Sequence, residues 1–232
     1  MSLRPKVKNV VLVHGAWADG SSWSKVIVLL QTKGYNVTAV QNPLTSFKED
    51  VDAAKRAIAA QDGPLILVGH SYGGVVVTEA GNDSKVAGLV YVAAFAPDAG
   101  QSILDISKDY PKPAGLEKIV PQPDGFLLLS PDGIETAFAQ DLDTEGKRLL
   151  TAVQTPTHGS LFAAQPTQAA WRNKPSWYVV ATNDHMIAPE QEADMAKRMR
   201  ATTTVLSSSH VAMLAHPEDV AKVIADASAG AS

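Results

Sequence analysis

The segment Pro64-Leu65-Ile66-Leu67-Val68-Gly69-His70-Ser71-Tyr72-Gly73-Gly74-Val75-Val76-Val77 joins two apolar runs through a Gly-x-Ser-x-Gly pentapeptide. The first run is rich in leucine and β-branched residues, which favours a buried strand, and we expect the second to be a helix. A serine between strand and helix in this pattern is typical of a nucleophile elbow, a sharp turn that raises the hydroxyl above the sheet. Gly69 and Gly73 are needed there because a Cβ would collide with neighbouring backbone. We therefore predict that Ser71 is a nucleophile.

Strands and helices alternate along the chain on both sides of this elbow. Apolar runs predict further strands at 7–13, 35–40, 86–94, 176–181 and 202–206. Amphipathic patterns and stop signals predict helices at 24–34, 47–61, 189–200 and 217–227. This alternation is typical of an α/β fold with a mostly parallel sheet flanked by helices.

The segment 97–174 interrupts the alternation. It is rich in proline and only loosely periodic, with short helical pieces such as 133–141. A structureless loop of this length is uncommon in a compact domain, so we expect an inserted, mainly helical cap. The core then consists of 1–96 and 175–232, and its size is that of one domain.

Composition narrows the classes of function. The chain has 232 residues, a formal net charge of -4 and no cysteine. An acidic chain lacks the basic surface that nucleic acid requires, and the missing cysteines exclude a disulfide framework and a thiolate metal site. The sequence also has no His-x-x-x-His pair, no Walker loop and no dinucleotide-binding glycine fingerprint. We expect no metal or cofactor, and a monomer or homodimer that acts on a small molecule.

The N-terminal segment 1–6 is basic, but the apolar run after it covers only Val10–Val13 before His14 and Gly15 interrupt it. A secretory signal needs about 7–15 apolar residues and a membrane helix about 20. We therefore expect a cytoplasmic protein without a membrane partner. The lack of cysteine fits a reducing compartment.

A serine hydroxyl is a weak nucleophile at neutral pH, so Ser71 needs a base that takes its proton and an acid that orients the base. Where a nucleophile elbow is used, the acid and then the histidine follow the serine along the chain. Asp184 and His210 fit this order, and each comes directly after a predicted strand. Because the ends of parallel strands converge at one sheet edge, we predict Asp184 as the acid and His210 as the base. Asp98 also follows a strand and stays an alternative acid.

The other acidic and histidine side chains are less suitable by position. They are Asp141, Asp143 and His158 in the predicted cap, His70 within the elbow, His185 beside the predicted acid, His216 at the start of the last helix and His14 at the end of the first strand. We expect His14 to hydrogen-bond loop backbone. Because a general base must be unprotonated and free histidine titrates near about pH 6.5, we expect the rate to fall below about pH 6.

Attack on a carbonyl creates an oxyanion, which needs backbone N–H donors held in place. One donor follows the nucleophile and another comes from an earlier loop. We predict that these donors are Tyr72 and, in the loop His14-Gly15-Ala16-Trp17, Ala16. The aromatic residues that we expect to line an apolar substrate pocket are Trp17, Phe95, Phe126, Phe138 and Trp171.

Taken together, these motifs make the chain similar to members of the α/β-hydrolase superfamily, and the similarity covers nearly its whole length. The segments that carry it are His14-Gly15-Ala16-Trp17, Gly69-His70-Ser71-Tyr72-Gly73-Gly74, Thr182-Asn183-Asp184 and His210-Val211-Ala212-Met213-Leu214. The chain most resembles the branch of small bacterial carboxylesterases and plant methylesterases that also contains hydroxynitrile lyases. The resemblance implies hydrolysis of small esters through an acyl-enzyme, with the triad and oxyanion positions at Ser71, Asp184, His210, Ala16 and Tyr72.

The lyases of that branch carry a threonine after the first-loop histidine and a lysine after the catalytic histidine. This chain has Gly15 and Val211 at those positions. Cyanohydrin cleavage therefore lacks its cationic partner, and we expect a carboxylesterase for small to medium, uncharged esters. The alternatives are a C–C lyase or hydrolase with the same triad, and a ligand-binding receptor that has lost turnover.

Overall fold

A six-stranded parallel sheet forms the centre of the computed structural model, which describes residues 7–231. Its strand order is β2-β1-β3-β4-β8-β9. The strands are β1 (Asn9–Val13), β2 (Asn36–Val40), β3 (Leu65–Ser71), β4 (Val86–Ala94), β8 (Ser176–Ala181) and β9 (Thr202–Leu206). Strands β1, β3, β4 and β8 lie inside the sheet and are buried almost throughout, which explains their nearly continuous apolar sequences. The two edge strands, β2 and β9, keep partly exposed residues.

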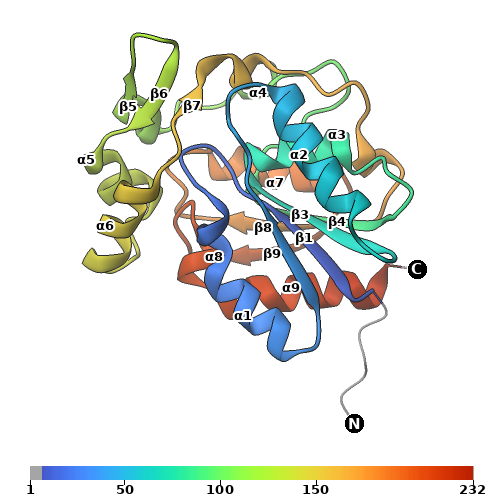
Figure 1. Cartoon of the computed structure of the whole chain (residues 1–232). Coiled ribbons are helices and arrows are strands. Elements are labelled where there is room, and N and C mark those ends of the chain that lie inside the picture. The colour runs from blue at the N-terminus through green and yellow to red at the C-terminus, as the bar shows by residue number, and fades with distance from the viewer. Residues whose placement is uncertain (1–6, 232) are drawn as a thin grey trace.

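Helices cover both faces of this sheet, so the predicted α/β fold is confirmed (Figure 1). Helices α1, α8 and α9 pack together on one face, and α2, α3 and α7 lie on the other (Figure 1). Their bounds are α1 (Ser24–Thr32), α2 (Phe47–Ala59), α3 (Gly73–Ala80), α7 (Pro189–Arg198), α8 (Ala212–Ala215) and α9 (Pro217–Gly230). Most of these ends fall within a few residues of those that the sequence predicts, because glycine, proline and capping residues mark them.

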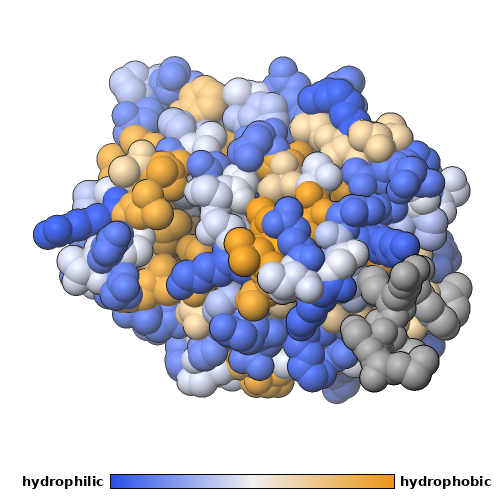
Figure 2. All heavy atoms as spheres, turned by 60° about the horizontal axis from the view of Figure 1, so that its bottom comes forward, coloured by the Kyte–Doolittle hydropathy of each residue, from blue (hydrophilic) through white to orange (hydrophobic). Residues whose placement is uncertain are grey.

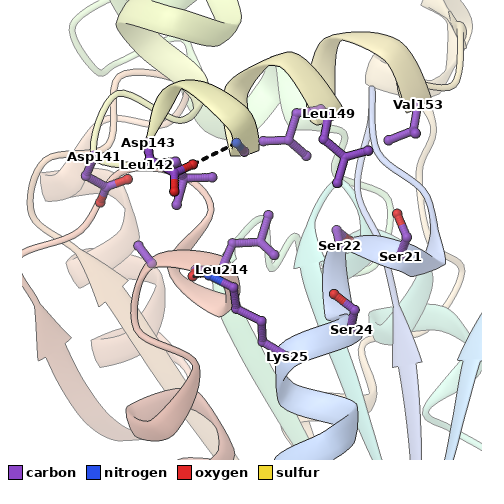
Figure 3. Close-up of a pocket in the computed structure, with 13 residues that line it drawn as sticks. Ser21, Ser22, Ser24, Lys25, Asp141, Leu142, Asp143, Leu149, Val153 and Leu214 are labelled. Atoms are coloured by element: carbon purple, nitrogen blue, oxygen red, sulfur yellow. Dashed lines mark hydrogen bonds between the residues drawn. The ribbon is translucent and has the colours of Figure 1, made fainter.

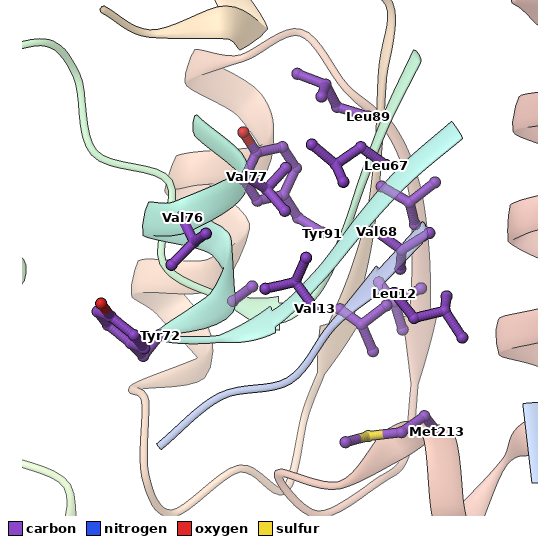
Figure 4. Close-up of a cluster of buried hydrophobic side chains, with 14 of the residues drawn as sticks. Leu12, Val13, Leu67, Val68, Tyr72, Val76, Val77, Leu89, Tyr91 and Met213 are labelled. Carbon is purple, nitrogen blue, oxygen red and sulfur yellow. The ribbon is translucent and has the colours of Figure 1, made fainter. Parts of the chain in front are cut away.

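The core lies where the elbow helix α3 packs on the central strands. Figure 4 shows Leu12 and Val13 from β1 beside Leu67 and Val68 from β3, with Met213 of α8 closing the same cluster. All five side chains are fully buried. The strand that ends in Ser71 is therefore held from both faces and from both neighbouring strands, which makes it a rigid support for a site.

The segment 97–174 contains both helices and strands. It includes α4 (Ile103–Ser107), α5 (Pro131–Gly133) and α6 (Thr144–Val153), and a three-stranded antiparallel sheet of β5 (Ile119–Pro121), β6 (Phe126–Leu129) and β7 (Thr157–His158). Figure 1 shows α5, α6 and these strands together at one side of the main sheet. The sequence did not predict the small sheet, because strands of two to four residues are too short to show an alternating pattern.

The surface is mostly polar. On the face seen in Figure 2, hydrophilic side chains surround small hydrophobic patches. The large apolar side chains that stand exposed are Val28, Leu104, Val120, Leu149 and Val205. None of the helices in the described part of the chain combines the length and the apolar character needed to cross a bilayer. The basic segment 1–6, on which the expectation of no signal sequence partly rests, lies outside the described residues.

Candidate active site

Ser71 ends β3 with a left-handed backbone (φ 53°), a conformation that a residue with a Cβ rarely adopts. The turn is possible because glycines surround it. A Cβ on Gly69 would lie 2.7 Å from the Gly73 carbonyl oxygen, and one on Gly73 would lie 2.6 Å from the Val13 carbonyl oxygen. The Ser71 side chain lines a cavity and makes no hydrogen bond to any other described residue. The backbone therefore has the geometry of a nucleophile elbow.

Asp184 and His210 form a buried hydrogen-bonded pair. His210 Nδ1 lies 2.5 Å from Asp184 Oδ2, and both side chains are almost completely buried. The other oxygen, Asp184 Oδ1, accepts the backbone N–H groups of Met186 at 2.6 Å and Ile187 at 3.0 Å. These bonds hold the carboxylate and place the imidazole proton on Nδ1, so Nε2 is free to accept a proton. The structure thus joins the acid and the base that the sequence predicts.

Two further rings, those of His70 and Phe138, contact His210. His70, inside the elbow, lies 2.9 Å through Nε2 from the backbone carbonyl oxygen of His210. Since a carbonyl oxygen only accepts, Nε2 of His70 carries the proton and donates it. Phe138 packs its ring 5.2 Å from the His210 ring. Burial lowers the pKa of His70 to about 3, so this ring is a neutral support near neutral pH.

The loop after β1 reaches the same edge of the sheet. Asn42 donates its backbone N–H to His14 Nε2 at 2.9 Å, which leaves the proton on Nδ1 for the Gly15 carbonyl oxygen, also at 2.9 Å. The expected bonding of His14 to loop backbone is confirmed. The backbone N–H groups of Ala16 and Tyr72 are buried, and no acceptor for either is found in the region that the structure describes. Such donors are suited to an anion brought by a ligand.

A cavity of about 520 Å³ opens above Ser71 and His210. Its wall is mainly apolar, and its polar members include Gln191 and Tyr110. The side chains of Lys108 and Lys112 also line it and are exposed. No carboxylate lines it among residues 7–231. The arrangement suits a largely apolar ligand that carries no positive charge.

Of the five aromatic residues predicted to line the pocket, Trp17 and Phe95 do so. For the other three, the prediction that they line this cavity is wrong. Phe138 is fully buried behind His210, and Phe126 packs edge-on against His158 in the small sheet. Trp171 donates its Nε1–H to the Pro97 carbonyl oxygen, away from the cavity. Each ring is used for packing, and nothing in the sequence pattern distinguishes packing from lining.

Comparison with known proteins shows the family to which the chain belongs. A family model described as the Alpha/beta hydrolase family matches residues 10–223. The chain belongs to this family. It is 26% identical to a pyrethroid hydrolase of Sphingobium wenxiniae, over 95% of this chain and 87% of that protein. It is 23% identical to polyneuridine aldehyde esterase of Rauvolfia serpentina, over 95% of this chain and 96% of that protein.

This alpha/beta hydrolase has the same fold as solved structures of hydrolases. The structure of a pyrethroid hydrolase from Sphingobium faniae JZ-2 superposes with a TM-score of 0.82 at 22% identity. The match covers 97% of this chain and 98% of that one. The predicted superfamily is therefore confirmed, and the bacterial hydrolase and the plant esterase among the relatives agree with the predicted branch.

The rival acid, Asp98, is engaged elsewhere in this alpha/beta hydrolase. Its Oδ1 accepts Nε–H of Arg172 at 2.8 Å, and the two side chains form a surface ion pair. By contrast, Asp141, which the sequence assigns only to the cap, reaches the loop of the predicted base. Its Oδ2 accepts the backbone N–H of Ser209 at 2.7 Å, next to His210.

Sequence reasoning missed two buried carboxyl groups beside the site. Asp50 of α2 accepts the Tyr72 hydroxyl and the Leu44 backbone N–H, both at 2.8 Å, and burial raises its pKa to about 6. Glu192 of α7 is fully buried near Asp184. Each acid lies on the apolar stripe of its helix, and a carboxylate within such a stripe was the signal that could have identified both.

A second cavity, of about 310 Å³, lies between helix α6, in the segment 97–174, and the start of α1. Figure 3 shows Leu149 and Val153 of α6 facing Ser21, Ser24 and Lys25 across it. None of the predicted triad, oxyanion or pocket residues lines this cavity within the described part of the chain. It is therefore separate from the cavity above Ser71.

Proposed function

We propose that this alpha/beta hydrolase is a serine carboxylesterase that cleaves small to medium, uncharged carboxylic esters through an acyl-enzyme. The observation that carries the proposal is the buried Asp184–His210 hydrogen bond beside a cavity that His210 shares with Ser71. Relatives named as esterases and hydrolases support the same class of reaction. The mainly apolar wall of the described cavity favours a largely apolar substrate, and the lack of a carboxylate among its described residues gives a cationic substrate no partner.

In the first half of the reaction, Ser71 Oγ attacks the ester carbonyl carbon while its proton passes to His210 Nε2. Asp184 keeps the imidazole oriented and stabilises its positive charge. The carbonyl oxygen becomes an oxyanion that accepts the N–H groups of Ala16 and Tyr72. The C–O bond to the alcohol then breaks, and His210 gives its proton to the leaving alcohol.

In the second half, water takes the place of the alcohol. His210 removes a proton from the water as it attacks the acyl carbon, and the same two N–H groups stabilise the second oxyanion. Collapse of this intermediate releases the carboxylic acid and returns the proton to Ser71. One ester and one water thus give one acid and one alcohol, with the enzyme unchanged.

The test is hydrolysis of p-nitrophenyl esters of increasing acyl length by the wild-type protein and by Ser71→Ala. We expect turnover for short and medium chains and a loss of at least about a thousandfold in Ser71→Ala. A fluorophosphonate probe, mapped by mass spectrometry, should label Ser71.

A matched control is Ser24→Ala, which changes a serine that lines only the second cavity and should leave turnover unaltered. Labelling of Ser71 without ester turnover would refute the ester as substrate and leave an activated serine for another bond. Saturable ligand binding with neither turnover nor labelling would refute the enzyme and favour a receptor. Cyanide release from mandelonitrile would instead identify a lyase.

A further inference from the structure

Glu192 is an acidic residue in the interior of the core. It lies on α7, fully buried, on the same side of the helix as Met195, Ala196 and Met199. One of its oxygens, Oε2, accepts the backbone N–H of Ala181 at 2.9 Å. An ionised carboxylate in such a place is costly unless charges and hydrogen bonds compensate it.

The second oxygen of Glu192 has no ordinary partner. Oε1 is completely buried, and among residues 7–231 no N–H or O–H group donates to it. The Glu192 side chain also lies within hydrogen-bonding reach of the carboxyl group of Asp184, the predicted acid of the triad. Two ionised carboxylates repel, so a bond between them requires a proton on one of them. A proton on Glu192 would both satisfy this oxygen and make the bond to Asp184 attractive.

We propose that Glu192 is a positioning residue: a neutral carboxylic acid whose Oε1–H donates to the Asp184 carboxylate and holds it against His210. This inference rests on the proposed triad. Asp184 then accepts from two backbone N–H groups on one side, from His210 Nδ1–H on another, and from Glu192 on a third. A carboxylate so surrounded has one orientation, which fixes the orientation of the base.

The distribution of charge agrees with a proton on Glu192. Burial, followed by the charge of Asp184, raises the pKa of Glu192 well above its usual range. Burial alone would also raise the pKa of Asp184, but the charge and hydrogen bond of His210 and the hydrogen bond of Glu192 outweigh it and lower that pKa. A further titratable group that faces Glu192 is Tyr178 of β8, whose pKa burial raises well above its usual range, so it stays neutral.

Two variants of nearly equal shape separate a hydrogen-bonding role from a packing role. Glu192→Gln keeps a neutral donor for Asp184 and an acceptor for the Ala181 N–H. Glu192→Met fills the same space with neither. We expect Glu192→Gln to keep kcat within about threefold of wild type, and Glu192→Met to lose about ten- to a hundredfold in kcat. KM should change little in both, because Glu192 is not among the described residues that line the cavity.

The pH profile of kcat/KM tests the charge. A neutral Glu192 carries no charge to remove, so Glu192→Gln should leave the midpoint of the acid limb within about 0.3 of wild type. If Glu192 were ionised, loss of its negative charge would move that midpoint down by about one pH unit and overturn the proposal. Equal kcat in Glu192→Met and wild type would also overturn it, since the bond would then position nothing.

An infrared difference spectrum of wild type minus Glu192→Gln gives a readout that needs no turnover. It should show the C=O stretch of a protonated carboxylic acid at neutral pH. A carboxylate band instead would refute the proton on Glu192. If no ester is hydrolysed but the acid band is present, the proposed function fails and the proton-sharing pair stands. If Glu192→Met does not fold, Glu192→Gln still decides the charge through the spectrum and the pH profile.

Discussion

Gly15 is the contact between the first loop and the nucleophile elbow, and its replacement by alanine tests how closely the two must approach. A Cβ at this position would lie 2.6 Å from Ser71 Cβ and 2.9 Å from the His70 carbonyl oxygen. Ordinary contact begins at 3.4 Å, so Ser71 Cβ and the new methyl group would have to separate by about 0.8 Å. The His70 backbone is part of β3 and has little freedom to yield.

Such a displacement affects both stability and rate. Overpacking of this kind typically costs about 1–3 kcal/mol of unfolding free energy. A misplacement of about 1 Å at the reacting atom costs about a hundredfold in rate. We therefore expect Gly15→Ala to lower kcat on a p-nitrophenyl ester about a hundredfold, with a reduced thermal midpoint. The loop amide of Ala16 would shift with it, which adds to the loss.

The matched control is Gly63→Ala, the same substitution at an open position. A Cβ there meets only Asn9 Nδ2, at 3.8 Å. We expect unchanged kcat and stability equal to or about 0.4–1 kcal/mol above wild type, because alanine restricts the unfolded chain. Activity of Gly15→Ala within threefold of wild type would refute the argument that this close approach positions Ser71.

Substitutions at two further residues test groups beside the site. Burial raises the pKa of Asp50 from its ordinary 3.8 to about 6, so its contribution to stability is complete below about pH 4 and is lost as the pH rises through about 6. In wild type, the Asp50 carboxyl should lower the free energy of unfolding by about 3 kcal/mol between pH 4 and 7, and Asp50→Asn should remove this decrease. Urea unfolding at several pH values measures it, and a variant whose free energy of unfolding changes with pH as steeply as that of wild type would contradict the prediction. Asp141→Ala should lower kcat about three- to tenfold by freeing the Ser209 N–H, whereas Asp141→Asn, which keeps an acceptor, should not.

The main sheet and its helices follow from local sequence signals. The predicted strands 86–94, 176–181 and 202–206 have the same first and last residues in the structure. Each is a run of residues that favour strands, and turn or capping residues bound it. The order of strands is not visible in such runs, since it depends on which apolar faces meet in the folded chain. The small sheet in the segment 97–174 was missed because its pairing joins β6 to a two-residue strand about thirty residues away.

The candidate site also has a part that the sequence predicts and a part that depends on tertiary contacts. Gly-x-Ser-x-Gly and the strand ends at Asp184 and His210 can be found from the chain, because strand ends converge wherever the sheet is parallel. The surroundings of these residues cannot be predicted from the sequence. Whether an aromatic ring lines the cavity, like Phe95, or packs behind it, like Phe138, depends on side-chain directions that only tertiary contacts decide.

The contacts of segment 97–174, the predicted cap, link the wall of the cavity to the loops of the predicted acid and base. Some residues of this segment line the cavity, and others hydrogen-bond the two loops. Gln140 donates to the Asn183 carbonyl oxygen at 2.6 Å, and the Gly115 N–H donates to the His185 carbonyl oxygen at 2.9 Å, on either side of Asp184. A ligand that shifts the cap would therefore shift the Asp184–His210 pair as well. Substitutions in the cap should then alter kcat and KM together rather than KM alone.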